Sequence, residues 1–578
     1  MLKKCGHCGQ NFEFSSDDAA FHERISPIFA GKKYQMPAPT LCPDCRNQRR
    51  QMFRNDRVFY NRKCDLTGKQ FISIFAPGSS YKIYHPDAWY GDKWNAMDFG
   101  RDYDFNRPFF EQLNELMHDV PRLGIDIVNC ENSYYCNFCS DDKDCYLDIA
   151  GEANRDSYFN LFVKYSKDTV DCTFVYNSEL CYECINCYDC YNVQNSMYCE
   201  NCSDCYFCFD LKGCKNCIFS HGLRSKEYHI FNEKKTKEEY ADYMKRLTMG
   251  SYAQRQKLYE GWTKFKLENA IFRGNYFLNC ENCGGNDIKN SKNTFYSFNV
   301  LNCEDCKFLY DVLDAKDCRD LNYSLYKPEL SYELISSLNM VKCAFSMASH
   351  YNSDVYYCEM LNHCANMFGC SGLTHKQYCI LNKQYSKEEY EELVPRIIKH
   401  MERAHGASAQ AERRSGSASL GEFFPASVSP FAYNETVANE YFPLSKENVL
   451  SRGWRWQDTP SEARGYQEKQ SAEGGHLYKI PDNINDVNDD ILGKVLICEK
   501  SGKPYKIIEQ ELKFYRRIKI PVPHRSPDQR HVDRINLRTP RHLFDRKCDK
   551  CRTSLMSPYK SDAKEKVFCD KCYIEKIY

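Results

Sequence analysis

A cysteine-rich stretch in the middle of the chain constrains the fold most strongly. Between Cys181 and Cys217 the sequence is CYECINCYDCYNVQNSMYCENCSDCYFCFDLKGCKNC, in which four cysteines recur 18 residues later and neighbouring cysteines lie three residues apart. The same phase continues upstream, where cysteines are sparse, at Cys136, Cys145 and Cys172. A repeat spacing that continues where the cysteines become sparse is typical of stacked units, each of which packs only against its neighbours.

We therefore predict a mainly β protein built around a Cys-rich parallel β-solenoid, with the cysteines inside it. A buried thiol is small and weakly polar, so it suits a narrow interior. Metal binding is the alternative, because C-x2-C-x2-C-x2-C is similar to iron–sulfur spacing, although the longer last gap and the proline of the bacterial ferredoxin run are missing. A metal-storage or redox role for the cysteine ladder therefore stays open.

The predicted solenoid has two halves. Residues 225–240 recur as residues 375–390, 150 residues later. Each copy holds a strand, an asparagine and a helix that starts at Thr236 or Ser386 with Glu three residues on, which is a capping box. The first helix is expected to continue to Phe265. The predicted halves, each closed by its helix, are residues 129–265 and 266–403.

Composition restricts the setting more than the partner. The 578 residues carry 79 basic and 79 acidic side chains, so net charge indicates no partner. No apolar run reaches the roughly 20 residues that cross a bilayer, and the N-terminus lacks the apolar core of a signal peptide. We expect a cytoplasmic protein with no membrane partner, in which the 35 cysteines are zinc ligands or buried thiols and not disulfides.

Two CxxC pairs near the N-terminus, Cys5/Cys8 and Cys42/Cys45, predict a zinc ribbon or treble clef. Four thiolates suit tetrahedral zinc and leave no position for a catalytic water, so the ion is expected to be structural. The motif resembles a bacterial zinc-ribbon family with CxxCG, aromatic residues and CPxCR. The residues that carry this resemblance are Cys5, Cys8, Gly9, Phe12, Phe14, Phe21 and the CPDCR of residues 42–46.

An internal comparison predicts further ribbons. Residues 530–548 match residues 46–64 in length and in their RKCD ending. A gapless alignment places Cys64, Thr67, His85 and Ala88 on Cys548, Cys551, Cys569 and Cys572. The preceding unit at the C-terminus places Cys498, Ser501, Ser526 and Gln529 on Cys5, Cys8, Cys42 and Cys45.

Each end therefore carries a tandem ribbon pair with one intact and one decayed site, at residues 1–88 and 491–578. We expect two Zn²⁺ ions per chain. Zinc supplies much of the folding free energy of such units, so each decayed ribbon is expected to dock on its intact neighbour. The alternative is that Cys64 and His85 hold a metal with outside ligands.

Three connecting regions complete the prediction. Residues 89–128 are expected to cap the first coil and to contain a helix from Phe109 to Met117, ended before Pro121. Residues 404–490 are predicted to be a linker and wrapping segment. Within them, residues 404–421 are small and polar and predict a flexible linker, residues 422–456 are expected to wrap the ribbons or the solenoid, and residues 460–490 predict an acidic loop.

Taken together, these parts resemble a group of bacterial zinc-ribbon (treble-clef) proteins with a Cys-rich central repeat region, known mainly from metagenomic genomes. The resemblance covers nearly the whole chain and includes the segment EFFPASVSPFAYNETVA. It implies the fold and no activity.

We predict no catalytic residues. The chain has no G-x-S-x-G, no phosphate-cradling glycine loop, no HExxH and no dinucleotide fingerprint. Asp141, Asp142 and Asp144 are the one acidic group considered for a carbohydrate-type enzyme. Acidic residues beside a repeat are more often solvated turn residues.

Basic helices follow CPDCR and SPDQR, and arginine forks suit phosphate. The sequence therefore predicts a non-enzymatic zinc-binding scaffold that binds RNA or DNA, including on the ribosome. Two alternatives remain: these arginines pair with acidic regions of the protein itself, leaving a structural or protein–protein scaffold, or the cysteine ladder stores metal. The arginines predicted to bind nucleic acid are Arg46, Arg49, Arg50, Arg54, Arg57, Arg62, Arg530, Arg534, Arg538 and Arg541.

Overall fold

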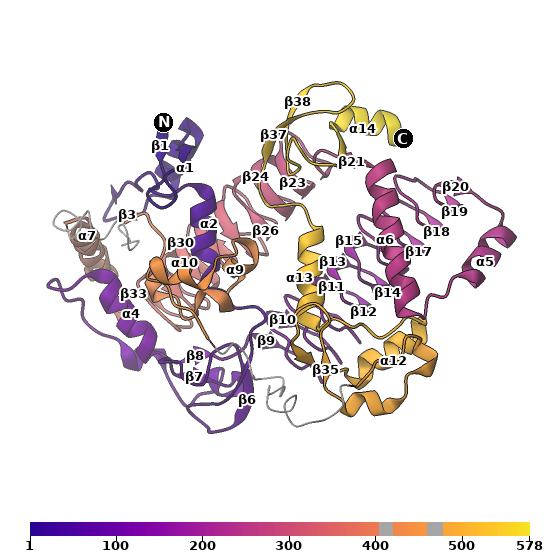
Figure 1. Cartoon of the computed structure of the whole chain (residues 1–578). Coiled ribbons are helices and arrows are strands. Elements are labelled where there is room, and N and C mark those ends of the chain that lie inside the picture. Colours follow the sequence, from indigo (N-terminus) through magenta and orange to yellow (C-terminus); the bar gives the residue numbers. More distant parts are fainter. Residues whose placement is uncertain (404–419, 459–477) are drawn as a thin grey trace. The chain divides into compact units, whose positions relative to one another are not determined.

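The computed structural model describes residues 1–403, 420–458 and 478–578. Contacts divide the chain into two units, each made of two separate stretches (Figure 1). Unit 1 combines Met1–Gly124 with Asn275–Ser461, and unit 2 combines Ile125–Gly274 with Glu462–Tyr578. The ribbons at each end of the chain therefore belong to the same unit as the central half that is more distant in sequence.

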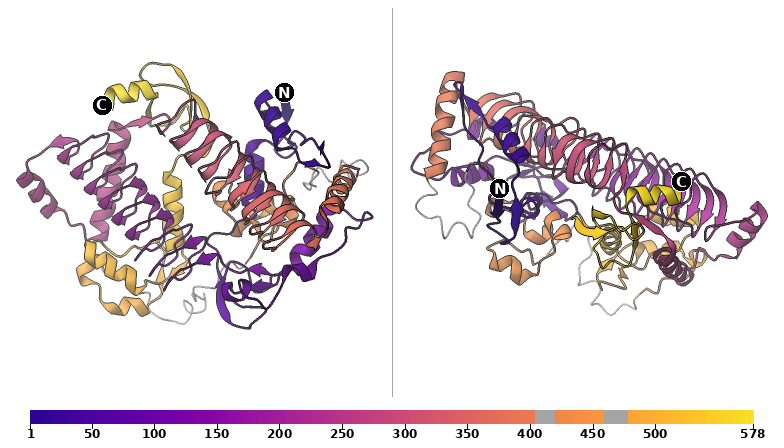
Figure 2. Two further views of the ribbon diagram at one scale, coloured as in Figure 1. Left: turned by 180° about the vertical axis from the view of Figure 1, so that it is seen from behind. Right: turned by 90° about the horizontal axis from the view of Figure 1, so that it is seen from above.

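Parallel strands form one stack in each unit, shown as rows of arrows in Figure 2. In the first stack, Leu161 pairs with Thr173 and Thr173 pairs with Ile185, so one coil takes 12 residues. The stacking period is therefore 12 and not the 18 of the cysteine repeat. Eighteen residues are one and a half coils, so successive copies of the cysteine motif occupy opposite sides of the stack.

The strands of the two stacks have these bounds. The first stack contains β9 (Ile127–Val128), β10 (Cys139–Ser140), β11 (Leu161–Lys164), β12 (Lys167–Val170), β13 (Thr173–Tyr176), β14 (Glu179–Tyr182), β15 (Ile185–Tyr188), β16 (Tyr191–Gln194), β17 (Ser203–Tyr206), β18 (Lys215–Ile218), β19 (Glu227–Ile230) and β20 (Glu233–Lys234). The second stack contains β22 (Phe277–Leu278), β23 (Gly284–Lys289), β24 (Lys292–Leu301), β25 (Glu304–Lys307), β26 (Tyr310–Leu313), β27 (Arg319–Asn322), β28 (Tyr332–Ile335), β29 (Leu338–Val341), β30 (Ala344–Met347), β31 (His350–Glu359), β32 (Ala365–Phe368), β33 (Gln377–Ile380) and β34 (Lys383–Gln384).

A three-residue rule organises the first stack. Every third residue from Asn129 to Phe231 has a positive φ, which turns the chain at a corner. Asparagine and aspartate occupy many corners because they tolerate the left-handed conformation best among residues with a side chain. The cysteines occupy positions directly after the corners. Those from Cys172 to Cys217 form one buried cluster with Val163, Val175, Val193 and Leu211. The predicted subperiod of three is therefore the spacing of inward positions.

The second stack begins with a register shift at Gly285. The pairing of β23 with β24 shifts between Gly284 and Gly285, and a Cβ on Gly285 would lie 2.0 Å from the carbonyl oxygen of Ser297. We expect Gly285→Ala to destabilise unit 1 by about 1–3 kcal/mol or more, because the strands must separate. Gly261→Ala is the matched control, since a Cβ there meets open space in a helix and should be neutral or stabilising by about 1 kcal/mol. Urea unfolding measures the change in stability of both variants. Equal changes would contradict the close approach of β23 to β24 at Gly285.

Helices follow both stacks, and both predicted capping boxes are present. Thr236 starts α5 (Lys237–Arg246) and exchanges hydrogen bonds with Glu239, as Ser386 does with Glu389 before α7 (Lys387–Arg403). The predicted continuous helix to Phe265 is wrong. The chain breaks after α5 and starts α6 (Tyr252–Asn269) at a new cap, Ser251.

The remaining elements belong to the ribbons and their connections. At the N-terminal side they are β1 (Leu2–Lys4), β2 (Asn11–Glu13), α1 (Ser16–Ile25), β3 (Ile28–Phe29), β4 (Lys32–Lys33), α2 (Pro43–Gln51), β5 (Tyr60–Lys63), β6 (Gln70–Ser73), β7 (Ile83–Tyr84), α3 (Pro86–Trp89), η1 (Ala96–Phe99), α4 (Phe109–Asp119) and β8 (Arg122–Leu123). At the C-terminal side they are β21 (Ile271–Arg273), η4 (Ile484–Asp486), η5 (Asp489–Gly493), β35 (Leu496–Ile497), β36 (Pro504–Tyr505), α12 (Glu509–Ile518), α13 (Pro527–Leu537), β37 (Phe544–Lys547), β38 (Ser554–Ser557), β39 (Lys566–Phe568) and α14 (Asp570–Ile577). Between them lie η2 (Ala426–Val428), η3 (Tyr433–Glu435), α9 (Val437–Tyr441) and α10 (Lys446–Ser451).

The two units contain equivalent contacts, as an internal duplication requires. In unit 1, Ser73 Oγ donates to the carbonyl of Gly124 at 2.8 Å, just before the first stack begins. In unit 2, Ser557 Oγ donates to the carbonyl of Gly274 at 2.7 Å, just before the second stack begins. The second ribbon of each pair therefore holds the same connecting strand in the same way.

The segment after residue 421 lies against the N-terminal ribbons and the second stack. Glu422 accepts from the backbone N–H of Thr40 at 2.7 Å, and the backbone N–H of Val437 donates to the carbonyl of Arg54 at 2.9 Å. Glu422 and Val437, from the segment predicted to wrap, therefore contact the N-terminal ribbons within unit 1. Most of the predicted flexible linker and of the acidic loop, at residues 404–419 and 459–477, lies outside the described residues.

Candidate metal centres

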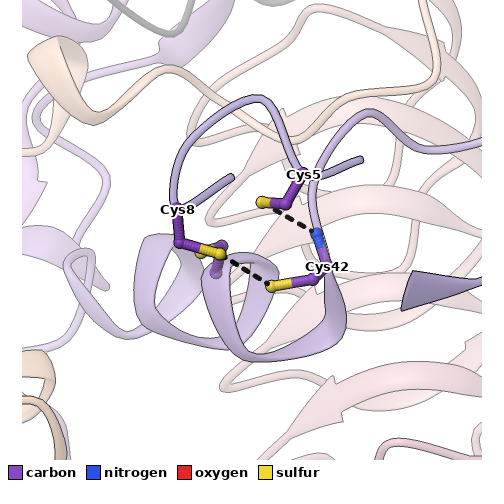
Figure 3. Close-up of side chains that lie close together, drawn as sticks. Cys5, Cys8 and Cys42 are labelled. Atoms are coloured by element: carbon purple, nitrogen blue, oxygen red, sulfur yellow. Dashed lines mark hydrogen bonds between the residues drawn. The ribbon is translucent and has the colours of Figure 1, made fainter. Parts of the chain in front are cut away.

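Four cysteines from two turns meet near the N-terminus. Cys5 and Cys8 lie in the turn between β1 and β2, and Cys42 and Cys45 lie at the start of α2. The Sγ atoms of Cys8 and Cys42 are 3.7 Å apart, and the backbone N–H of Cys42 donates to Cys5 Sγ at 3.3 Å (Figure 3). All four sulfur atoms lie within 4.8 Å of one another, so one ion can contact all of them.

The C-terminal group repeats this geometry. Cys548 and Cys551 follow β37, and Cys569 and Cys572 start α14. The Sγ atoms of Cys551 and Cys569 are 3.7 Å apart, and the backbone N–H of Cys569 donates to Cys548 Sγ at 3.2 Å. These four sulfur atoms also lie within 4.8 Å of one another. Both predicted four-cysteine groups are therefore present and able to hold a metal ion.

Local hydrogen bonds favour the thiolate form of one cysteine in each group, and in the absence of an ion the pKa values of Cys45 and Cys572 are raised by hydrogen bonding and burial. Hydrogen bonding with Cys45 lowers the pKa of Cys42 to about 5, and hydrogen bonding with Thr553 lowers the pKa of Cys551 to about 6. Cys42 and Cys569 are also the N-caps of their helices, where the helix dipole stabilises negative charge. Each group can therefore present at least one thiolate near neutral pH to an incoming ion.

Each decayed ribbon keeps one cysteine whose sulfur accepts a backbone hydrogen bond, as a cysteine of the intact groups does, but it lacks the other three cysteines. The N–H of His85 donates to Cys64 Sγ at 3.3 Å, and the N–H of Ser501 donates to Cys498 Sγ at 3.5 Å. In the part of the chain that the structure describes, Cys64 and His85 belong to no group of three or more metal donors. The other aligned positions contribute no such group either: Thr67 and Ala88 in one ribbon, and Ser501, Ser526 and Gln529 in the other.

The cysteine that remains in each decayed ribbon is buried in an apolar cluster. Cys498 lies in a core cluster with Tyr158, Phe159 and Val170 of the first stack. Cys64 packs with Tyr84 and Ala88 of its own ribbon and with Trp89 and Trp94, which follow it. In both decayed ribbons the remaining thiol is therefore part of an apolar core.

The central thiols are buried and hydrogen-bonded to backbone carbonyls. Cys184 Sγ donates to the carbonyls of Tyr182 and Val193 at 3.6 and 3.1 Å. Burial raises the pKa of Cys343 in the second stack to about 12. Among the described residues, Cys145 is the one stack cysteine in a group of three or more donors close enough for an ion. The ladder as a whole therefore has the contacts of packed thiols.

The three acidic residues considered for catalysis do not converge. Asp141 and Asp144 are corner residues with positive φ, and they accept hydrogen bonds from Asn129 and Asn132. Asp142 is fully buried at an inward position. This arrangement offers no paired carboxylates to a substrate on the outer face.

The arginines of α2 point into the second stack. Arg46 Nη2 lies 2.7 Å from Asp320 Oδ2, and Arg50 Nη1 lies 3.2 Å from Asp320 Oδ1. Arg49 pairs with Glu333 at 3.0 Å, and Arg50 is fully buried. These side chains neutralise carboxylates of their own unit, so they do not form the exposed nucleic-acid surface that we expected.

The arginines of α13 do the same in unit 2. Arg530 Nε and Arg534 Nη1 lie 2.9 and 2.5 Å from the two carboxylate oxygens of Asp171. The other predicted residues are also engaged: Arg54 pairs with Asp56, Arg62 pairs with Asp65, Arg57 is buried, Arg538 lies over the ring of Phe174, and Arg541 is half-buried.

The stack carboxylates that receive these arginines were not among the predicted site residues. Asp171 and Asp320 are equivalent residues of the duplicated stacks, and both are corner residues with φ of 56° and 58°. In the sequence they are recognisable only because they occupy equivalent positions of the two halves. The offset between them is 149 residues, one less than the repeat of 150, because the pairing register shifts at Gly285. The alternative of pairing inside the protein is therefore right, although the partners lie in the stacks and not in the acidic regions.

Comparisons with known proteins do not place the chain in a family. No family model matches it, and no curated protein matches it. Among solved structures, a protein described as a "putative acetyltransferase" from Desulfovibrio desulfuricans G20 is 7% identical over 43% of this chain and 65% of that chain, less than two thirds of its length. The TM-score of 0.10 is too low to bear on fold or function. No helix within the described ranges has the length and apolar character to cross a membrane.

Proposed function

We propose that the protein is a non-enzymatic zinc-binding scaffold, in which the two stacks are β-solenoids and the ribbons are fastened to them. Zinc is the proposed ion because it is borderline-soft and accepts four thiolates in tetrahedral geometry. The proposed compartment is the cytoplasm, because thiols stay reduced there and remain available as zinc ligands.

One observation carries the proposal: the residue directly after the fourth cysteine of each intact ribbon reaches a buried carboxylate of a stack. Arg46 follows Cys45 and binds Asp320. Tyr573 follows Cys572 and donates to Asp210, which also pairs with Arg224 at 2.9 Å. An ion that fixes the start of the helix therefore also fixes the side chain that docks the ribbon.

The proposal gives the protein a structural or protein-binding role. The arginines next to the ribbons are occupied by Asp171, Asp320 and Glu333, so they lack the free charge that a phosphate backbone needs. Several tyrosines of the stacks are exposed, and two of them stack on a neighbouring ring, Tyr296 on Phe308 and Tyr351 on His363; these surfaces suit contact with another protein. The exposed tyrosines include Tyr134, Tyr165, Tyr191, Tyr296 and Tyr351.

We expect the purified protein to show no salt-sensitive binding to nucleic acid. The measurement is fluorescence anisotropy of labelled single-stranded RNA and DNA between about 50 and about 200 mM salt, a range over which phosphate-dependent affinity falls steeply. Arg538→Ala is an informative variant, because this arginine is only half-buried. Tight binding at low salt that weakens in this variant would contradict the proposal.

A further inference from the structure

One coil of the first stack has an unusual interior. Asp142, Cys145, Asp148 and Gly151 are four successive inward positions, in the phase that cysteine occupies elsewhere in this stack. The two aspartates and the cysteine are buried, and one donor atom from each lies within 4.8 Å of the other two. Two carboxyl groups and a thiol therefore converge inside the protein.

Part of each carboxyl group has no protein partner. Asp142 Oδ1 accepts from the backbone N–H of Asn154 at 2.9 Å, and Asp148 Oδ2 accepts from Asn154 Nδ2 at 2.9 Å. Asp142 Oδ2 and Asp148 Oδ1 are buried and have no hydrogen-bond partner within the described residues. A buried carboxylate without compensation is costly, so these oxygens require a proton or a cation.

Gly151 keeps the side of the site next to these oxygens free of a side chain. Gly151 has no side chain, and a Cβ there would lie 2.8 Å from Asp142 Oδ2 and 2.9 Å from Asp148 Oδ2. A side chain at this position would therefore push against both carboxyl groups, and the glycine leaves their oxygens free to approach each other.

The second stack shows that the coil does not need these acids in order to pack. By the correspondence of Asp171 with Asp320, its equivalent positions are Ser291, Thr294, Ser297 and Val300. Ser291 Oγ and Ser297 Oγ donate to backbone carbonyls at 2.7 and 2.9 Å. Neutral residues that satisfy themselves locally fill the same place, so the acids of the first stack have another role.

We propose that Asp142, Cys145 and Asp148 bind a divalent zinc-type ion inside the first stack. Zinc accepts carboxylate oxygen and thiolate sulfur together, whereas calcium and magnesium select oxygen ligands alone. This ion is separate from the ions of the two ribbons, and it does not depend on the proposed scaffold function. The chain then binds three ions.

Elemental analysis of zinc-loaded protein tests the site. Asp142→Ser/Asp148→Ser copies the residues of the second stack, so it should fold while it loses one zinc per chain. Ser291→Ala/Ser297→Ala is the matched control in the second stack and should lose none. Cys572→Ser should lose a different ion, which separates a failure of this site from a failure of the ribbon sites.

Equal zinc content in the wild type and in the aspartate variant would overturn the proposal, because the two carboxyl groups would then hold protons. If that variant does not fold, Cys145→Thr replaces one ligand by the residue of the second stack, and it must also lose one zinc. Absorption spectra of the cobalt-loaded protein give a second measurement, because a site with one thiolate absorbs more weakly in the sulfur-to-cobalt band than a site with four. The spectrum of the aspartate variant should lack the weak contribution of the one-thiolate site and keep the strong contribution of the two ribbons. Identical spectra of the wild type and this variant would contradict the site.

Discussion

Asp320→Asn is expected to destabilise unit 1 by about 3–5 kcal/mol, because it leaves the buried charges of Arg46 and Arg50 without their shared partner. Asp171→Asn should do the same in unit 2 through Arg530 and Arg534. Urea unfolding of the full chain, followed by fluorescence and by protease sensitivity, measures the loss in each unit.

An exposed ion pair of the second stack gives the matched control. Asp354 lies 2.9 Å from Lys342, and the two side chains are 37% and 30% exposed. Asp354→Asn should cost less than about 1 kcal/mol. If Asp320→Asn has an equally small effect, the arginines are not docked on the stack and the scaffold proposal fails.

Removal of one metal ligand is the second large effect. Cys548→Ser should release the C-terminal ion and unfold its ribbon, since structural zinc contributes about 10–16 kcal/mol of binding free energy to such units. Cys498→Ser changes the corresponding cysteine of the metal-free ribbon, where the thiol accepts a hydrogen bond from the backbone N–H of Ser501. We expect this control to keep its full zinc content and the protease resistance of residues 544–577. Equal behaviour of the two variants would show that no ion supports the C-terminal ribbon.

Local patterns in the sequence predicted the features that depend on local chemistry. The spacing of Cys5 and Cys8, and of the three equivalent pairs, was sufficient to identify both four-cysteine groups. The capping boxes at Thr236 and Ser386 were also predicted correctly, because a cap involves residues three apart. The three-residue phase of the central cysteines gave the inward positions of the first stack.

Features that depend on stacking were not predictable in this way. The 18-residue cysteine repeat hides the 12-residue coil, because any multiple of three keeps a side chain inside. The partners of Arg46 and Arg530 lie hundreds of residues away, so a local excess of positive charge could not distinguish a buried ion pair from a nucleic-acid surface. Asp142 and Asp148 share the phase of Cys145, and this signal was available in the sequence but was overlooked.

The central claim is that the ribbon cysteines bind metal and that the cysteines from Cys181 to Cys217 do not. The most direct test compares the zinc content of the wild type with that of Cys45→Ser/Cys548→Ser. The account predicts that the double variant loses the two ribbon ions and that no further ion depends on the cysteines from Cys181 to Cys217. Metal that stays bound to the double variant in excess of the one ion proposed at Asp142, Cys145 and Asp148 would contradict it, because the central cysteines would then be the remaining ligands.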